Sequence, residues 1–422
     1  MTETHAEQSD DLVELELTTM AHGGSAIGRY EGRAIFVPYA IPGERILARI
    51  TQDKGRFAYA EGVTLLEASE ARVLPRCPHF GPKRCGGCHW QHIDYDAQLL
   101  FKQQIVADQL TRIGGIAEPP VLPTIPSPNP WQYRTHVTLH VTPDGQIGFV
   151  GTDDQQIVPI QECHIIRPEL QDLLERLDLQ MLDGNILSRV RLQVGTESDD
   201  RLIALSTVDD MPPAIELDLP LSVSFLSEDE YPQALIGTGK VHYTIKGRTF
   251  QVTAGSFFQV NLPIAEQLVD LVLEYLALQG TENVLDLYSG VGFFTAFLAE
   301  RAATVTAIEG SPTAVDDADA NLHDLTNVTL IEGLVEDVLP ELEERFDAVV
   351  LDPPRSGMEA SALDALSALA PAKIVYVSCD PATLARDAKR LLAKGYTLQV
   401  VQPLDMFPQT YHIECLAVLV RT

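Results

Sequence analysis

The chain has 422 residues, and its 30 Lys and Arg stand against 60 Asp and Glu, which gives a formal net charge of −30 at pH 7. This length predicts two or three domains. The charge argues against a general polyanion binder, so any contact with nucleic acid has to come from local basic patches. No apolar stretch is long enough to span a membrane, and the polar, acidic residues 1–10 lack the features of a signal peptide. We therefore expect a cytoplasmic protein with a flexible acidic tail over residues 1–10.

Residues 11–68 alternate apolar and polar side chains in short runs that are separated by glycines. Such a pattern predicts a small all-β barrel. Two blocks, Ala21-His-Gly-Gly-Ser-Ala-Ile-Gly28 and Phe36-Val-Pro-Tyr-Ala-Ile-Pro-Gly-Glu44, resemble in this order a TRAM domain, which is an OB-like RNA-binding barrel. We assign this barrel to residues 11–72.

Three cysteines, Cys77, Cys85 and Cys88, follow the barrel within a dozen residues, and Cys163 lies far along the chain. Clusters of this kind usually bind metal, and a disulfide framework is improbable in a cytoplasmic enzyme. Four thiolates suit either a tetrahedral zinc ion or a [4Fe–4S] cluster, and the spacing alone does not choose between them.

The middle of the chain gives weaker signals. Apolar residues recur with helical periodicity over residues 95–113, and six prolines between 119 and 130 indicate an extended connector. Residues 131–243 mix strand-like runs with one expected helix, Leu170–Met181, which indicates an α+β domain that contains Cys163. It carries no catalytic constellation. Arg134 is a candidate contact to nucleic acid, although a surface or ion-paired arginine is the commoner case.

A strand that runs into a glycine-rich turn begins at Val284 and includes Asp286, Gly290 and Gly292. A second strand ends in Glu309, where nucleotide-binding folds place a carboxylate that accepts hydrogen bonds from ribose hydroxyls. The turn has no third glycine and no Lys-Ser/Thr, so its sequence matches the phosphate-binding loops of nucleotide-binding proteins poorly. The pair of strands instead resembles the first motif of S-adenosylmethionine (SAM) methyltransferases, and the alternation of helix and strand continues to the end of the chain.

Three chemically active side chains stand at the ends of later strands. Asp352 ends one apolar run and is followed by Pro353-Pro354-Arg355, Cys379 ends another, and Glu414 opens the last one. Open α/β sheets place their chemistry at such an edge. A nucleophilic cysteine is superfluous for methylating an amine, but it is needed when the acceptor is an unactivated ring carbon such as C5 of uracil. Cys379 would add to C6, and Glu414 would remove the C5 proton.

The combined motifs resemble the RNA 5-methyluridine methyltransferase family, and the barrel and cysteine cluster resemble its 23S ribosomal RNA branch. The resemblance is carried by Phe257-Phe-Gln-Val-Asn261, Asp286-Leu-Tyr-Ser-Gly-Val-Gly292, Asp352-Pro-Pro-Arg-Ser-Gly357, Val377-Ser-Cys-Asp-Pro381 and His412-Ile-Glu414. It implies that Gln259, Tyr288, Glu309 and Asp352 contact SAM or the target uracil, and that Cys77, Cys85, Cys88 and Cys163 hold a [4Fe–4S] cluster, with zinc as the alternative occupant. Two positions depart from the pattern: Phe293 stands where the family usually has Asn, and Gly333 stands where Asn is common in the ribosomal branch.

The expected fold class is α/β, with a class I SAM-methyltransferase sheet at the C-terminus, the N-terminal barrel and an α+β iron–sulfur domain between them. We assign residues 73–93 and 127–255 to the iron–sulfur domain and residues 94–126 and 256–422 to the methyltransferase domain. The expected partner is 23S ribosomal RNA and the expected state a monomer. Transfer RNA as substrate, and a non-catalytic RNA-binding protein, are the alternatives.

The target base of a folded RNA has to be extruded to reach a buried nucleophile. Phe257 or Phe258 is a candidate to stack on that base, and a core position is about as common for such a residue. The candidate phosphate contacts are Arg355, Arg72, Arg76, Lys83 and Arg84.

Overall fold

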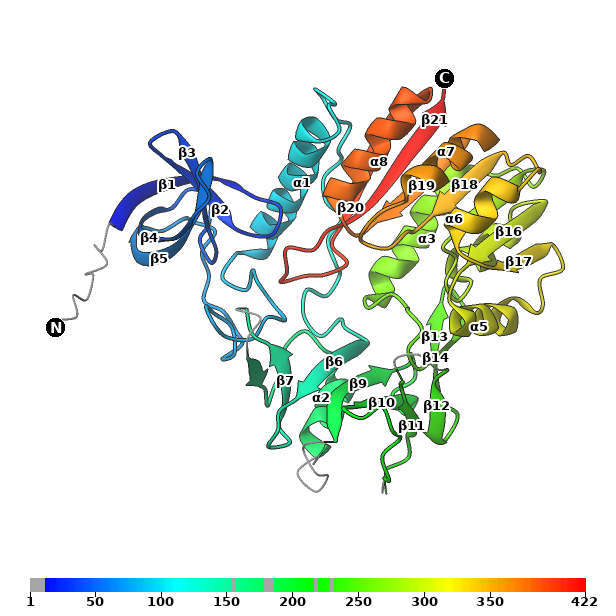
Figure 1. The fold of residues 1–422 in the computed structure, drawn as a ribbon, viewed down its shortest axis with the longest axis horizontal. Helices are drawn as coiled ribbons and strands as arrows, with labels where there is room; N and C mark the ends of the chain where they lie inside the picture. The colour runs from blue at the N-terminus through cyan, green and yellow to red at the C-terminus, as the bar shows by residue number, and fades with distance from the viewer. Residues whose placement is uncertain (1–11, 153–155, 178–185, 216–218, 228–230) are drawn as a thin grey trace, which may run out of the picture.

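A computed structural model describes residues 12–152, 156–177, 186–215, 219–227 and 231–422. The predicted tail, residues 1–10, lies outside the described residues. A closed barrel, a central sheet and a C-terminal sheet follow one another in this order along the chain (Figure 1). No helix in the described ranges is both long and apolar enough to cross a membrane.

The N-terminal barrel closes in the strand order β1-β2-β3-β5-β4. Its strands are β1 (Leu12–Met20), β2 (Ala26–Tyr30), β3 (Arg33–Val37), β4 (Arg45–Asp53) and β5 (Phe57–Glu67). In β1 the apolar residues Val13, Leu15 and Leu17 are buried, whereas Glu14 and Glu16 between them are exposed. Because successive side chains of a strand point to opposite faces, this alternation fills the barrel with apolar groups. The predicted all-β barrel is confirmed.

The central sheet has seven strands in the order β12-β11-β10-β9-β6-β7-β8. These are β6 (His136–Val141), β7 (Ile147–Val150), β8 (Ile157–Pro159), β9 (Leu187–Val194), β10 (Arg201–Thr207), β11 (Ser222–Phe225) and β12 (Gln233–Ile236). Helix α2 (Pro168–Arg176) packs on one face through Leu170, Leu173 and Leu174. The expected helix Leu170–Met181 is present but begins at Pro168 and ends at Arg176, because Leu177 has an extended backbone; residues 178–181 lie outside the described ranges. A hairpin of β13 (Lys240–Ile245) and β14 (Arg248–Thr253) leads to the last sheet.

The C-terminal sheet has the order β17-β16-β15-β18-β19-β21-β20. Its strands are β15 (Asn283–Leu287), β16 (Thr304–Glu309), β17 (Val328–Glu332), β18 (Ala348–Leu351), β19 (Lys373–Ser378), β20 (Tyr396–Leu404) and β21 (Glu414–Arg421). The first five in sheet order pair in parallel, and β21 is antiparallel to both of its neighbours. The carboxyl ends of the parallel strands therefore meet at one edge, as the sequence predicts.

Helices cover both faces of this sheet, which is why its central strands are apolar throughout. One face packs against α3 (Leu262–Leu276), α4 (Phe293–Ala299) and α5 (Pro312–Leu322). The other packs against α1 (Tyr95–Arg112), α7 (Ala360–Leu369) and α8 (Pro381–Ala393), with the short helices α6 (Val335–Val338) and η1 (Leu339–Glu341) at one side. Helix α1 lies beside α8 (Figure 1), although more than 250 residues separate them in the chain.

Candidate active site and cofactor pocket

The candidate nucleophile and base lie on neighbouring strands. In the antiparallel ladder of β19 and β21, Ser378 pairs with Cys415. The next positions on the two chains are Cys379 and Glu414, so these residues face each other where the ladder ends. Cys379 is half-buried and Glu414 is buried. The carboxylate of Asp380 accepts hydrogen bonds from the amides of Ala382 and Thr383 at 2.8 and 2.9 Å and so begins α8 directly after the nucleophile.

Negative charge gathers around the Cys379 thiol. Burial raises its pKa to about 12, and the carboxylates of Glu414 and Asp352 act in the same direction, whereas Arg355 lowers it. Burial and the charge of Asp352 also raise the pKa of Glu414 well above its usual value. The pKa of Asp352 is raised by burial as well. The charges of Glu414, Asp352 and Arg355 all act on the Cys379 thiol, so the four side chains form one cluster. A buried nucleophile beside a base is an arrangement typical of active sites.

A pocket of about 40 Å³ opens at the glycine-rich turn. Its walls include the predicted cofactor residues Gln259, Tyr288, Gly290 and Asp352. Gly290 has a left-handed φ of 55°, and a Cβ there would meet no atom within 4 Å, so this side of the turn is open. The buried Oγ of Ser289, which also lines the pocket, has no hydrogen-bond partner among the described residues. An open turn and an unsatisfied hydroxyl fit a polar ligand such as SAM.

Gly292 lies in a more crowded place than Gly290. Its φ is 81° at the start of α4, and a Cβ would lie 2.8 Å from the Leu322 side chain of α5. The absence of a side chain therefore permits α4 and α5 to pack closely.

Glu309 lies at the end of β16, as the sequence predicts, but its carboxylate is already engaged. It accepts hydrogen bonds from the amides of Gly290 and Ser311 at 2.8 and 2.7 Å. The hydroxyl of Tyr288 donates to Glu336 at 2.8 Å. These hydrogen bonds hold the side chains of Glu309 and Tyr288 in place. Each carboxylate oxygen of Glu309 can still accept a further hydrogen bond, such as one from a ribose hydroxyl.

The two departures from the family pattern have structural explanations. Phe293 is the first residue of α4, where it lines the cofactor pocket and makes an edge contact to Phe258, with ring centroids 5.5 Å apart. An aromatic wall therefore replaces the amide usual in the family. Gly333 has a φ of 159°, and a Cβ there would come within 2.6 Å of Val338, so the α6 segment packs too closely for a side chain.

The two candidate stacking residues separate clearly. Phe258 is buried and stacks on Tyr243, with centroids 4.6 Å apart and an angle of 6° between the rings, so it belongs to the core. Phe257 is 62% exposed and lines the cofactor pocket. Of these two rings, Phe257 is therefore the one accessible to an extruded base.

The candidate phosphate contacts also differ in their availability. Arg72 donates to Glu44 and to the carbonyl of Tyr39, and Arg84 donates to the carbonyl of Pro78, so both tie loops together. The Arg76 guanidinium lies 4.8 Å from the centroid of the Trp131 ring. Arg355 is exposed beside the nucleophile. Arg134 is partly buried, and its Nε has no hydrogen-bond partner within the described ranges.

A contact that the sequence did not predict joins the barrel to the nucleophile loop. Nε2 of His22, in the turn between β1 and β2, lies 3.5 Å from Oδ2 of Asp380. The indole of Trp90 donates to the carbonyl of Gly24 in the same turn, at 3.2 Å, and a Cβ at Gly24 would come within 2.8 Å of Tyr411. The motif around His22 was visible in the sequence, but its neighbour lies more than 350 residues away.

The four cysteines of the predicted cluster line one small cavity, together with Phe80 and Phe149. Burial raises the pKa of each thiol, and the charge of Cys163 acts in the same direction on Cys77, Cys85 and Cys88. The fold thus brings Cys163 to the other three, although 75 residues separate it from the nearest. Among the described residues, however, no three His, Cys, Asp or Glu side chains are arranged to hold a metal ion. The structure therefore confirms the convergence of the thiols and does not confirm a metal centre.

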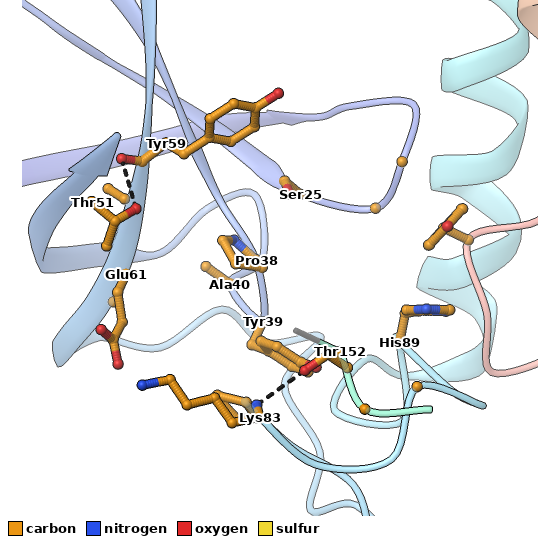
Figure 2. Close-up of a pocket in the computed structure, with 18 of the residues that line it drawn as sticks. Ser25, Pro38, Tyr39, Ala40, Thr51, Tyr59, Glu61, Lys83, His89 and Thr152 are labelled. Carbon is orange, nitrogen blue, oxygen red and sulfur yellow. Dashed lines mark hydrogen bonds between the residues drawn. The ribbon is translucent and has the colours of Figure 1, made fainter. Parts of the chain in front are cut away.

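A larger cavity, of about 880 Å³, lies between the barrel, the cysteine loop and the central sheet. Figure 2 shows the side chains of Tyr39, Lys83 and His89 around it, below the barrel strand that carries Glu61. Tyr411 also lines this cavity, and its ring centroid lies 4.3 Å from that of His89. Because Tyr411 immediately precedes His412-Ile-Glu414, this cavity leads from the barrel toward the candidate active site.

The fold and the pocket define a class I SAM-dependent methyltransferase with an added N-terminal barrel. The family model described as tRNA (Uracil-5-)-methyltransferase matches residues 239–422, and the TRAM domain model matches residues 12–63. An uncharacterized RNA methyltransferase of Streptomyces avermitilis is 37% identical over 96% of this chain and 97% of its own length. One of Halalkalibacterium halodurans is 34% identical over 97% of each chain.

The crystal structure of Pyrococcus abyssi tRNA (uracil-54, C5)-methyltransferase in complex with S-adenosyl-L-homocysteine superposes with a TM-score of 0.76. It is 28% identical, and the match covers 97% of this chain and 100% of that one. The chain belongs to the RNA uracil-5-methyltransferase family with a TRAM domain and is thus an enzyme of the class that transfers methyl groups from SAM to RNA. This leaves the alternative of a non-catalytic RNA-binding protein without support.

Proposed function

We propose that this enzyme methylates C5 of a uracil in RNA through a covalent bond between Cys379 and C6. The observation that carries the proposal is that Cys379 and Glu414 directly adjoin the last pair of the β19–β21 ladder, Ser378 and Cys415, and that the charges of Glu414 and of the pocket residue Asp352 both act on the Cys379 thiol. An amine acceptor would need neither residue, because its own lone pair attacks the methyl group. A nucleophile and a base together are required when a ring carbon is the acceptor.

The reaction divides between these two side chains. The Cys379 thiolate forms a bond to C6, and the electrons of the C5–C6 double bond move toward O4, so that C5 becomes nucleophilic. Bound SAM supplies the electrophilic methyl group that C5 then carries. Glu414 removes the proton from C5, the double bond forms again, and the S–C6 bond breaks to release the thiolate. Burial raises the pKa of Glu414 well above its usual value, and a carboxylate with a raised pKa is a stronger base for this step.

The proposed cofactor residues are Gln259, Tyr288, Gly290, Gly292, Glu309 and Asp352. Glu309 would accept hydrogen bonds from the ribose hydroxyls of SAM, and Gln259 and Asp352 would bind its other polar groups. The open turn at Gly290 would leave room for SAM to lie against the backbone. Arg355 lowers the pKa of Cys379, so it is the side chain in the cluster that favours the thiolate.

For the substrate we propose 23S ribosomal RNA, with the enzyme acting as a cytoplasmic monomer. The barrel together with the four converging cysteines supports this choice. A second candidate is transfer RNA, because the structure with the TM-score of 0.76 carries the name of a tRNA (uracil-54, C5)-methyltransferase.

We also propose that Cys77, Cys85, Cys88 and Cys163 hold a [4Fe–4S] cluster that joins the barrel-side loop to the central sheet. The supporting observation is that all four thiols line one cavity. Four cysteine thiolates are the usual ligands of such a cluster. The same four thiolates also suit a tetrahedral zinc ion, which is the alternative occupant.

The test uses RNA transcripts that carry 5-fluorouracil, because a C5 fluorine cannot be removed as a proton. With SAM and the authentic RNA, the wild-type enzyme should form an adduct that survives denaturing electrophoresis. Cys379→Ala should form none, and Cys415→Ala, which changes a buried thiol inside β21, should retain it. A wild-type enzyme that transfers tritiated methyl groups to uracil without any adduct would refute the covalent mechanism.

The choice of RNA is tested separately by mass spectrometry of RNA from cells that lack the protein. Loss of 5-methyluridine from 23S ribosomal RNA alone supports the first candidate, and loss from transfer RNA alone supports the second.

A further inference from the structure

One face of the central sheet carries positive charge that no carboxylate of the described residues neutralises. The register aligns Arg191 of β9 with Thr138 of β6 and Ala204 of β10, and it aligns Arg189 with His140 and Ser206. Residues two apart in a strand share a face, so these two rows lie side by side. The opposite face holds Val190, Leu192 and the apolar residues that pack on α2.

Arg191 is the most confined cation of this face. Its Nη2 donates to the carbonyl of Ser256 at 3.3 Å, and its Nε is buried without a hydrogen-bond partner in the described part of the chain. Burial and the nearby charge of Arg134 lower its pKa. The ring of His136 is buried close by with Nδ1 unpaired, and both arginines lower its pKa.

Cations that repel one another without a counter-ion are costly to bury. In a chain of net charge −30, acidic partners are abundant, and yet no described carboxylate forms an ion pair with Arg189 or Arg191. The buried carboxylate of Asp317 accepts hydrogen bonds from the hydroxyls of Thr253 and Ser256 at 2.6 and 2.9 Å. The arginines are therefore available to an anion from outside the chain.

Arg189 and Arg191 line a cavity of about 450 Å³. The cavity is also lined by Ser256, whose carbonyl accepts from Arg191, and by Ser311 and Thr313 at the start of α5. Hydroxyls and guanidinium groups that converge on one space are the donors that bind phosphate oxygens.

This cavity also adjoins the proposed active site. Ser256 precedes Phe257, the exposed ring at the cofactor pocket, and Ser311 donates its amide to Glu309. Thr138 lines both this cavity and the larger one beside the barrel. The face of the central sheet that carries the arginines therefore lies next to the cavity beside the barrel, to Phe257 and to the start of α5.

We propose that Arg189 and Arg191 bind a backbone phosphate of the substrate RNA, next to the nucleotide that stacks on Phe257. The proposal rests on the proposed function, because it takes RNA as the ligand. A phosphate contact of this kind positions the strand and carries no base specificity. It would also let an acidic protein bind RNA, since these positive groups are gathered on one face of the central sheet.

The test measures RNA affinity over a range of salt concentrations for the wild type and for Arg189→Gln/Arg191→Gln. Loss of this phosphate contact should weaken binding roughly tenfold and reduce the slope of log K against log salt by about 0.7. The matched control is Arg176→Gln, which removes an exposed, ion-paired charge from α2 on the opposite side of the sheet. It should leave the slope unchanged.

Binding of SAM and the melting temperature show whether the double variant is folded. Both should stay near the wild-type values, because neither arginine forms an ion pair with a described residue. Arg189→Lys/Arg191→Lys, which keeps the charge, should restore most of the salt slope. An unchanged slope in the Gln variant of an enzyme that methylates RNA would overturn this inference and leave the proposed function intact. Equal stabilisation of the wild type by inorganic phosphate and by RNA fragments would also overturn it, because a free-anion site would then account for the arginines.

Discussion

Nζ of Lys102, on α1, lies 2.6 Å from Oδ1 of Asp405, which follows β20, and both side chains are fully buried. Lys102 also donates to the carbonyl of Phe407 at 3.1 Å. This pair holds α1 against the methyltransferase sheet across 303 residues of chain, and the segment after Asp405 leads directly to His412 and Glu414. The position of the proposed base therefore depends on a residue far upstream.

We predict that Lys102→Met destabilises the protein by about 3–5 kcal/mol, because Asp405 would remain buried as an uncompensated charge. Urea-induced unfolding measures this loss. The control is Lys394→Met, which breaks an exposed pair with Asp364 and should cost less than about 1 kcal/mol. Lys102→Met/Asp405→Leu should recover most of the stability. A single variant as stable as the control would contradict the structural role of the pair.

The second prediction concerns the reactivity of Cys379 without ligands. Its pKa of about 12 means that the thiol is protonated at neutral pH, so alkylation by iodoacetamide should be slow and should accelerate as the pH rises. Glu414→Gln removes a negative neighbour and lowers the pKa of the thiol, and each unit of that decrease gives about tenfold more thiolate. Mass spectrometry of the Cys379 peptide at pH 8 measures the difference. Equal rates in the two proteins would contradict the coupling.

Glu414→Gln should also separate stability from turnover. The folded-state pKa values of Glu414 and Asp352 are raised, so their contribution to stability is complete below about pH 4 and is lost as the pH rises toward neutrality. The variant should therefore be more stable than the wild type at pH 8, by about 1–3 kcal/mol, and equally stable at pH 4. Thermal unfolding at both values measures this.

The same variant should accumulate the Cys379 adduct on ordinary RNA, because the C5 proton is no longer removed. Denaturing electrophoresis of the enzyme with labelled RNA measures the adduct. Turnover of the Glu414→Gln enzyme at the wild-type rate would show that another group is the base.

Phe257→Ala should raise KM for RNA roughly tenfold or more, since stacking of a base on an aromatic ring contributes about 1–3 kcal/mol. SAM binding should change little. Phe258→Leu, one residue away, should instead lower the melting temperature, because it removes the stacked contact with Tyr243. Steady-state kinetics and thermal unfolding distinguish the two effects. A KM for RNA that is unaffected in Phe257→Ala would contradict the stacking role.

Anaerobic purification should yield a brown protein with charge-transfer absorption, because four thiolates hold the proposed cluster. Cys163→Ser should bleach it and loosen the central sheet from the cysteine loop, whereas Cys415→Ser should keep the colour. Colourless protein with one zinc ion per chain would replace the cluster by zinc.

The amino-acid sequence alone predicted the barrel, the alternation of strands and helices in the C-terminal domain and the candidate reactive residues. These follow from local signals, namely the alternation of Val13, Leu15 and Leu17, the glycine-rich turn at Gly290, and a cysteine that ends an apolar run before Asp380. Local patterns suffice because backbone periodicity and turn chemistry act over a few residues.

Only the tertiary structure decided which of these side chains meet. The pairing of Cys379 with Glu414, the contact of His22 with Asp380, and the burial of Phe258 but not Phe257 depend on strand register and on packing between distant segments. The surroundings of Arg189 and Arg191 in the central sheet depend on strand register and packing in the same way. A sequence displays a charge, but whether a counter-charge lies beside it is set by the folding of the whole chain.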